Sequence, residues 1–231
     1  MANIRQPPNL EHLLGTDALG RDLFTRLLYG GRISISIGLT AALLGTSVGT
    51  LIGSVAGYYG KRIDNILMRF TDLAYSIPTL PLIIVLSAYM DTQAIGIVLI
   101  IGFFSWMQTA RVVRGAILSV KKNEYVTAAR ALGARNRLII FRHILPNIIN
   151  SVLVGATLGV GYAIITESAL SFLGLGVSAP TPTWGNMLMD SQATMATQPW
   201  LTIFPGMAIL ITVLFVNFIG DGLQDALDPT L

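Results

Sequence analysis

Five long stretches without a charged side chain constrain the fold of this 231-residue chain more than any other feature. A helix needs about 20 predominantly apolar residues to cross a hydrocarbon core of about 30 Å. Only 12% of the residues are charged and 53% are hydrophobic, whereas soluble domains carry about 25% charged residues. We therefore predict an all-α, polytopic bundle of membrane-spanning helices with five spans in this chain. The spans are assigned to Ile33–Tyr59, Leu73–Met90, Thr92–Ala110, Ile144–Thr166 and about Leu201–Ile219.

A further uncharged stretch, Ser168–Met189, is less suited to a span. Pro180, Pro182 and several glycines interrupt it, and these residues disfavour a continuous helix. Irregular backbone at membrane depth is tolerated only where protein or water satisfies its polar groups. The stretch is therefore predicted to be a helix end followed by an irregular loop, which lies outside the membrane or re-enters it.

The distribution of lysine and arginine predicts the orientation of the spans. Basic residues occupy the loops after the first and third predicted spans, and none lies in the loops after the second and fourth. By the positive-inside rule the two basic loops are cytoplasmic, as is the acidic tail after the fifth span. The basic residues are Lys61, Arg62, Arg69, Arg111, Arg114, Lys121, Lys122, Arg130, Arg135, Arg137 and Arg142, and the acidic ones are Asp221, Asp225 and Asp228.

The same orientation places residues 1–32 outside the membrane, ahead of a transmembrane domain over residues 33–231. Residues 1–32 contain several charges and the pair Pro7-Pro8 but no apolar core, so they predict neither a signal peptide nor a span. A segment that begins outside without such a signal predicts that another span precedes it. The protein is expected in the cell membrane as a multi-pass protein.

The cytoplasmic loop over residues 111–146 contains a short helical pattern that ends at a glycine. Residues 124–132 are good helix formers, and Glu124 suits the positive end of the helix dipole. Gly133 follows where a left-handed C-terminal cap belongs. Residues 136–143 predict a second helix, and Pro146 is tolerated in the first turn of the next span. The loop is interpreted either as a docking surface for a partner or as a solvated basic loop that only fixes the topology.

Four glycines recur every four residues along the first predicted span, at Gly45, Gly49, Gly53 and Gly57. This spacing places them on one face of a helix, where small residues let another backbone approach closely. The favoured interpretation is static packing within the bundle, and the alternative is a sliding or subunit interface.

Glu167 is an ionisable residue at the end of the fourth predicted span. Charges at membrane depth are costly and often functional, so Glu167 is a candidate for lining a transport pathway. The favoured alternative is a solvated or hydrogen-bonded carboxylate near the outer interface. Asp190 and Trp184 are candidate contacts for an external protein, and the favoured alternative for Trp184 is an interfacial anchor.

The sequence does not predict catalysis or metal binding. The stretch Gly60-Lys61-Arg62 lacks the spaced upstream glycine and the hydroxyl residue of a phosphate-binding loop. His12 and His143 lie on opposite sides of the membrane in the predicted topology, so they form neither a metal site nor a catalytic pair. The chain has no cysteine, and its net charge of +3 reflects the basic loops. No cofactor and no nucleic-acid partner is expected.

Several motifs occur in the loop and on both sides of it. The loop motif consists of Thr127, Ala128, Ala129, Gly133, Leu145 and Pro146. The other motifs are Leu14–Asp22, Ser171–Gly176, Pro180–Gly185 and Gly220–Pro229. Together they resemble the permease subunits of ABC importers for dipeptides and oligopeptides, whose loop pattern is E-A-A-x3-G-x9-I-x-L-P. Thr127 stands where the pattern has glutamate and His143 where it has isoleucine, and Glu124 is the candidate substitute for the missing carboxylate.

The resemblance implies a type I ABC-importer permease, a family that usually has six spans, the first of them before Leu14. It implies that an external binding protein delivers a peptide to a pathway between two homologous permeases, driven by two cytoplasmic ATPases. Thr127, Ala128, Ala129 and Gly133 would contact the ATPases, and Leu145-Pro146 would anchor the next span. A nickel or other small-solute permease is an alternative within this class. The alternative outside it is a secondary transporter, which is expected to show internal repeats and membrane-centre ion ligands.

Overall fold

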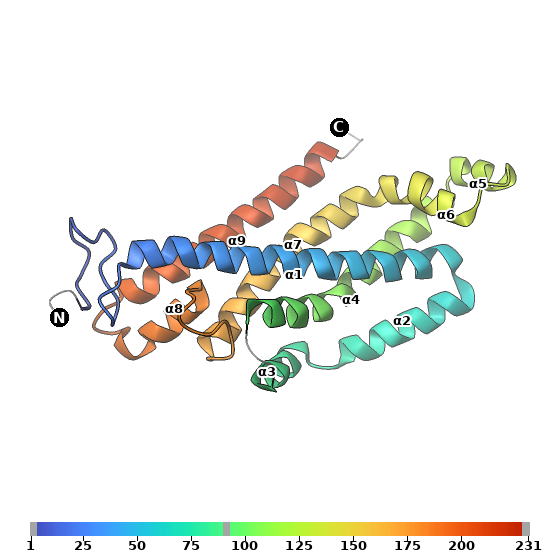
Figure 1. The fold of residues 1–231 in the computed structure, drawn as a ribbon. Coiled ribbons are helices and arrows are strands. Elements are labelled where there is room, and N and C mark those ends of the chain that lie inside the picture. Colours follow the sequence, from blue (N-terminus) through green and yellow to red (C-terminus); the bar gives the residue numbers. More distant parts are fainter. Residues whose placement is uncertain (1–3, 90–92, 228–231) are drawn as a thin grey trace. The chain divides into compact units, whose positions relative to one another are not determined.

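A computed structural model describes residues 4–89 and 93–227 of the chain, and these residues form helices joined by loops (Figure 1). Strand pairing in the described part is limited to an isolated bridge between Thr16 and Asp22. The helices are α1 (Leu23–Tyr59), α2 (Lys61–Ser76), α3 (Thr79–Tyr89), α4 (Ala94–Val120), α5 (Glu124–Ala131), α6 (Asn136–Leu138), α7 (Leu145–Phe172), α8 (Trp184–Ser191) and α9 (Trp200–Leu227). A π-helical turn, Ile139–Ile144, joins α6 to α7, and a 3-10 turn, Gln192–Thr194, follows α8. The all-α prediction is confirmed.

Four helical stretches are long and apolar enough to cross a membrane, with mean hydropathies between 1.6 and 2.2. They are α1, α4, the continuous stretch from α6 through α7, and α9. Together α2 and α3 meet the same requirement, but they are bent by 75° where they meet. The described residues therefore hold four spans, or five if the bent pair is one span, which agrees with the predicted number. Met90 and Asp228, which figure in the predictions, lie outside the described residues.

The prediction of a continuous second span over Leu73–Met90 is wrong. α2 ends at Ser76, and its C-cap residue Ile77 has an extended backbone with φ −79° and ψ 129°. Pro78 explains the break, because the ring of a proline drives the preceding residue out of the helical region. The length of the uncharged run concealed this interruption.

α1 begins at Leu23 rather than at the predicted Ile33. Asp22 accounts for the earlier start, because its carboxylate accepts a hydrogen bond from the Thr25 backbone N–H at 2.8 Å. Such a bond satisfies a donor that the first turn of a helix leaves free. The loop predicted after the first span is also helical, since its basic residues belong to α2. These residues are Lys61, Arg62 and Arg69.

The described residues form two compact units, and α1, α4, α7 and α9 contribute to both. The first unit is drawn from Met1–Ala41, Leu80–Ile101 and Val160–Val216, and the second from Ala42–Thr79, Gly102–Gly159 and Asn217–Leu231. Each unit has its own packing, described in turn below.

In the first unit, α8 and the start of α9 pack against the start of α1. Leu23, Trp184, Met187 and Leu201 form the buried core of this contact. The indole N–H of Trp184 donates to the carbonyl of Leu27 at 3.0 Å, and the residue is only 5% exposed. The expectation that Trp184 is an interfacial anchor is therefore wrong, because a buried indole with a satisfied donor is a core residue.

In the second unit, α1 packs against α4 along the four glycines. A Cβ atom at Gly49 would lie 2.6 Å from the Trp106 carbonyl oxygen, and one at Gly53 would lie 2.5 Å from that of Ala110. The other two glycines also face α4: a Cβ atom at Gly45 would overlap Ser105 Oγ, and one at Gly57 would lie 3.0 Å from Ile117 Cβ. The two backbones therefore approach more closely than any side chain allows, as small residues permit in membrane helices. This contact lies within one chain.

Candidate functional site

The predicted loop over residues 111–146 starts later than expected, because α4 continues to Val120. Ion pairs hold the basic residues at this end of α4 to α2. The guanidinium of Arg114 donates to both carboxylate oxygens of Asp64, at 2.5 and 2.6 Å. Arg111 pairs with Asp72 at 2.7 Å. These arginines are engaged within the chain. The segment that follows α4, residues 121–144, is called the basic loop below.

Within the basic loop, α5 ends in a left-handed glycine cap. Gly133 has φ +80°, and its N–H donates to the Arg130 carbonyl at 3.0 Å. The N–H of Ala134 donates to the Ala129 carbonyl at 3.1 Å. These two bonds form a Schellman motif, in which glycine is favoured at the left-handed position. The helix therefore stops at the position that the sequence predicts, and Glu124 lies in its first turn.

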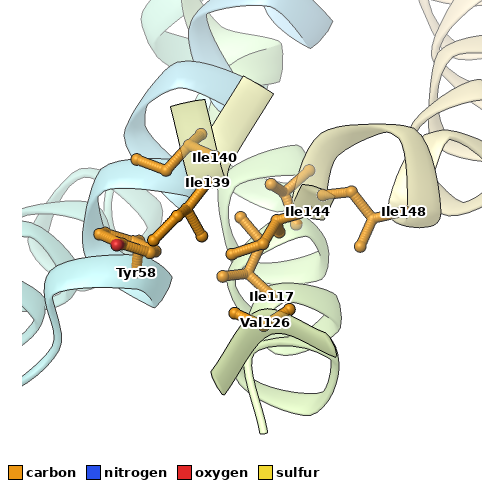
Figure 2. Packing of buried hydrophobic residues seen from close by; sticks show 8 residues of the cluster. Tyr58, Ile117, Val126, Ile139, Ile140, Ile144 and Ile148 are labelled. Carbon is orange, nitrogen blue, oxygen red and sulfur yellow. The ribbon is translucent and has the colours of Figure 1, made fainter. Parts of the chain in front are cut away.

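One residue of α5 anchors the helix to the second unit. Val126 is fully buried, with 0% exposure, and it packs near Ile117 of α4 and Ile144 of the π turn (Figure 2). The whole apolar cluster consists of Tyr58, Val113, Ile117, Val126, Ile139, Ile140, Ile144 and Ile148. Full burial of a valine side chain contributes about 1.5–3 kcal/mol. The position of an eight-residue helix thus depends on apolar burial at a single position.

Tyr58, near the end of α1, holds the other side of the basic loop. Its hydroxyl donates to Asn136 Oδ1 at 2.8 Å, and the guanidinium of Arg130 lies 5.8 Å from the centre of its ring. A cation over an aromatic face is attracted by the ring electrons. Neither Tyr58 nor Val126 is predictable from the sequence, because no local pattern pairs either residue with its distant neighbours.

The outward surface of α5 carries most of the residues that the loop motif singles out. Glu124, Thr127 and Ala128 are exposed, and Ala129 is half-buried. The Thr127 hydroxyl donates back to the carbonyl of Asn123 at 3.4 Å, within the loop itself. Leu132 is also 88% exposed although it is large and apolar.

The second predicted helix starts at Asn136, as expected, but it is not a separate helix. α6 covers only Asn136–Leu138, and the π turn carries it into α7. Leu145 packs against the isoleucine cluster. Pro146 follows in the first turn of α7. A proline removes one helical hydrogen bond, and the π turn directly before it is where the backbone pattern changes. Pro146 therefore marks a change within a continuous helix rather than the start of one.

Glu167 lies in α7 and is fully buried in the first unit, with 0% exposure. Ser171 Oγ donates to its Oε1 at 2.7 Å, and Ser34 Oγ donates to its Oε2 at 3.1 Å. The alternative of a solvated carboxylate is therefore wrong, whereas a hydrogen-bonded carboxylate is present. Because the side chain is enclosed, it presents no surface to a pathway in this structure.

A network of charges ties the N-terminal segment to α1 and α8 in the first unit. Asp17 Oδ2 accepts bonds from Arg21 Nε at 2.7 Å and from an Arg26 amino group at 2.6 Å. Arg26 also pairs with Asp190 at 3.2 Å. Burial raises the pKa of the Asp17 carboxyl, but hydrogen bonds from Arg21, Leu19 and Arg26 outweigh it and hold the pKa below its ordinary value of 3.8.

Beside this network lies a cavity of about 340 Å³. Arg21, Arg26 and Asp190 line one side of it, and Ser171 and Asn186 line another. Asp190, a candidate contact for an external protein, is thus already paired within the chain, although its side chain is 43% exposed. Among the described residues, no three histidine, aspartate or glutamate side chains gather as metal ligands.

The long apolar helices define a polytopic membrane protein. The chain belongs to the family of binding-protein-dependent transport system inner membrane components, whose model matches residues 49–231. It is thus an inner-membrane, multi-pass permease subunit of an ABC importer, and the secondary-transporter alternative is wrong.

Relatives in this family cover the whole chain. It is 43% identical over 231 residues to the oligopeptide transport system permease protein OppC of Bacillus subtilis, covering 100% of this chain and 76% of that protein. It is 43% identical over 230 residues to the dipeptide permease DppC of Alkalihalophilus pseudofirmus, with the same coverage. It is also 43% identical over 228 residues to the glutathione permease GsiD of Pectobacterium atrosepticum, covering 99% of this chain and 76% of that protein.

Solved structures show the same fold at low sequence identity. A chain of the inward-facing MetNI methionine ABC transporter matches with a TM-score of 0.75 at 15% identity, covering 89% of this chain and 98% of that chain. A chain of an amino acid ABC transporter crystallised with histidines matches with a TM-score of 0.67 at 14% identity, covering 88% and 95%. The ABC-importer permease fold predicted from the sequence is confirmed.

Proposed function

We propose that the protein imports dipeptides or oligopeptides together with a second, homologous permease. The observation that carries the proposal is 43% identity, over the full length of the chain, to permeases of oligopeptide and dipeptide transport systems. The glutathione permease at the same identity fits this substrate class, because glutathione is itself a tripeptide. Nickel or another small solute is the alternative with less support.

Two cytoplasmic ATPase subunits would drive this transport through α5. The exposed surface of Glu124, Thr127, Ala128 and Leu132 supports this role, because it leaves the helix available to a partner. Val126 shares its apolar cluster with residues of α4 and α7, so a displacement of α5 acts on both long helices. A partner shifts the equilibrium between two states only by binding them differently. The coupling contacts are therefore expected to change when the ATPases close on ATP.

The orientation follows from the positive-inside rule and belongs to the same proposal. The basic loop and the end of α9 face the cytoplasm, since the excess of lysine and arginine lies on that side. The N-terminal segment and α8 then face outward, where an external binding protein delivers the peptide. ATP hydrolysis is assigned to the ATPase subunits rather than to this chain.

The experiment that tests the proposal is reconstitution of the full complex in proteoliposomes. The chain is co-purified with its candidate partner permease, two ATPases and binding protein, and ATP hydrolysis is measured with dipeptides, longer peptides, glutathione and nickel. Peptide-loaded binding protein is expected to stimulate hydrolysis and uptake, and nickel is not. Failure of the chain to assemble with any ATPase would contradict the proposal. Stimulation by nickel alone would mean that the substrate is nickel and not a peptide.

A further inference from the structure

A single buried carboxylate joins three segments of the first unit. Glu167 of α7 accepts a hydrogen bond from Ser34 of α1 and another from Ser171, one turn further along α7. Ser34 Oγ in turn accepts the backbone N–H of Trp184, the first residue of α8, at 3.2 Å. The N-cap residue of α8, Thr183, donates to Ser171 Oγ at 3.4 Å. The carboxylate is thus connected to the beginning of α8 along two routes.

Glycines let α8 approach both partner helices closely at this point. A Cβ atom at Gly31 of α1 would lie 2.8 Å from the Trp184 ring. A Cβ atom at Gly185 would lie 2.7 Å from Ser168 of α7. Neither helix leaves room for a side chain there, so the beginning of α8 is wedged between α1 and α7. We call Ser34, Glu167, Ser171 and the beginning of α8 the α8 latch.

The latch places a carboxylate where it is costly unless its oxygens are bonded. A charge taken out of water must be paired or hydrogen-bonded to persist, and both oxygens of Glu167 have hydroxyl donors here. If α8 moved away from α1 and α7, the Trp184 N–H would lose its bond to Ser34 Oγ, and the Thr183 hydroxyl would lose its bond to Ser171 Oγ. Such a loss makes separation of the three segments unfavourable.

We infer that Glu167 is a positioning residue that keeps α8 joined to α1 and α7 as one body throughout the transport cycle. This inference rests on the proposed function, because the segment it positions is the one that would face the binding protein. Ser171 and Asn186 also line the cavity beside Asp190, so the latch fixes one wall of that cavity as well. A loose α8 would still permit assembly with the ATPases but would weaken the response to the binding protein.

The first arm of the test compares two serines of α1 in the reconstituted complex. Ser34→Ala keeps Glu167 but removes the bond to the Trp184 N–H, whereas Ser36→Ala changes an exposed serine two positions away. Ser34→Ala is expected to lower the maximal binding-protein-stimulated ATP hydrolysis and uptake about tenfold, with basal hydrolysis and subunit composition unchanged. Ser36→Ala is expected to match the unsubstituted chain. Equal maximal rates in all three proteins would overturn the inference.

The second arm replaces the carboxylate by a covalent link, which is possible because the chain has no cysteine. Ser171→Cys and Thr183→Cys are introduced together with Glu167→Ala, at positions whose hydroxyl oxygens lie 3.4 Å apart. Reduced, this protein is expected to show the same loss of stimulation as Glu167→Ala alone. Oxidised, it is expected to recover most of the stimulated rate, and a reductant should abolish the recovery.

Three outcomes separate this inference from the proposed function and from a general loss of stability. No stimulation of the unsubstituted complex by any peptide-loaded binding protein would refute the proposed function, and the latch role that depends on it. Stimulation of that complex without any effect of Ser34→Ala would refute the latch alone. A verified disulfide that leaves the stimulated rate as low as in the reduced protein would also refute the latch. Holding α8 against α7 would then not be what Glu167 contributes to transport.

Discussion

Two helices of equal length, α5 and α8, are built into the protein in opposite ways. Each has eight residues. α5 buries only Val126, and its N-cap residue Asn123 makes no side-chain capping bond. α8 buries five residues, and a capping box between Thr183 and Asn186 closes its beginning. α5 therefore leaves most of its side chains exposed, whereas α8 uses its side chains to hold itself in place.

The largest expected effect concerns the single anchor of α5. Val126→Asp would place a charge among buried isoleucines, and an unpaired buried charge costs several kcal/mol. α5 is therefore expected to leave the cluster, so that peptide uptake by the reconstituted complex falls to background and the ATPases no longer co-purify. Val126→Ile, which keeps the position apolar, is the control. Normal uptake by Val126→Asp would show that α5 does not depend on this anchor.

The next effect tests the close contact between α1 and α4. Gly49→Val would force side-chain atoms into the contact with α4, where a Cβ alone would lie 2.6 Å from a backbone oxygen. Overpacking costs about 1–3 kcal/mol, so the melting temperature of the protein in detergent is expected to fall. Gly155→Val is the matched control, because a Cβ there meets nothing within 4 Å. Equal melting temperatures would mean that α1 and α4 separate without cost.

A third prediction isolates the conformation of the glycine cap from its packing. Gly133 and Gly115 both have no atom within 4 Å of an added Cβ, and only Gly133 has a positive φ, of +80°. Gly133→Val should therefore cost about 1–2 kcal/mol through backbone strain, whereas Gly115→Val has no such strain. The expected result is continued ATP hydrolysis with less peptide transported per ATP in Gly133→Val. If the two variants transported the same amount of peptide per ATP, the conformation of the cap would have no role in coupling.

These glycines also show what the sequence could and could not predict. Gly133 was predictable because a helix cap is local and leaves its signature in adjacent residues. The break at Ile77 was also encoded locally, by Pro78, but the uncharged run was judged by its length. The bond between Ser34 and Glu167 spans 133 positions, and no local pattern connects two such residues. Composition therefore predicted the spans, local chemistry predicted α5, and only tertiary structure revealed the α8 latch and the Val126 anchor.

The next prediction concerns the charge network that ties the N-terminal segment to α8. It tests how the stability of this network depends on pH. Because the folded pKa of Asp17 lies below its ordinary value of 3.8, its carboxylate adds stability above that value, and this stability is lost as the pH falls further. The backbone N–H groups of Leu19 and Arg21 donate to Asp17. Their hydrogen-exchange protection should stay constant from neutral pH down to about 4 and fall as the pH is lowered below 3.8.

Substitution of Asp17 supplies the control for this titration. Asp17→Asn should have low protection already at neutral pH and a flatter dependence on acid. Asp190→Asn, which removes only a half-exposed partner of Arg26, should keep most of the acid-dependent loss. An unchanged acid profile in Asp17→Asn would assign the titration to another group.

The smallest expected effect decides whether Glu124 takes the place of the missing family glutamate at Thr127. The two side chains are three positions apart on α5 and both are exposed, so they lie on neighbouring parts of one helix surface. If Glu124 contacts the ATPase, Glu124→Gln should weaken assembly a few-fold, the effect should shrink at high salt, and Thr127→Glu should restore assembly in the double variant. If Glu124 only complements the helix dipole, its loss costs about 0.3–1 kcal/mol within α5, and a carboxylate at position 127 should not restore assembly. Titration of the ATPase against each variant, at two salt concentrations, distinguishes a partner-facing carboxylate from one that serves its own helix.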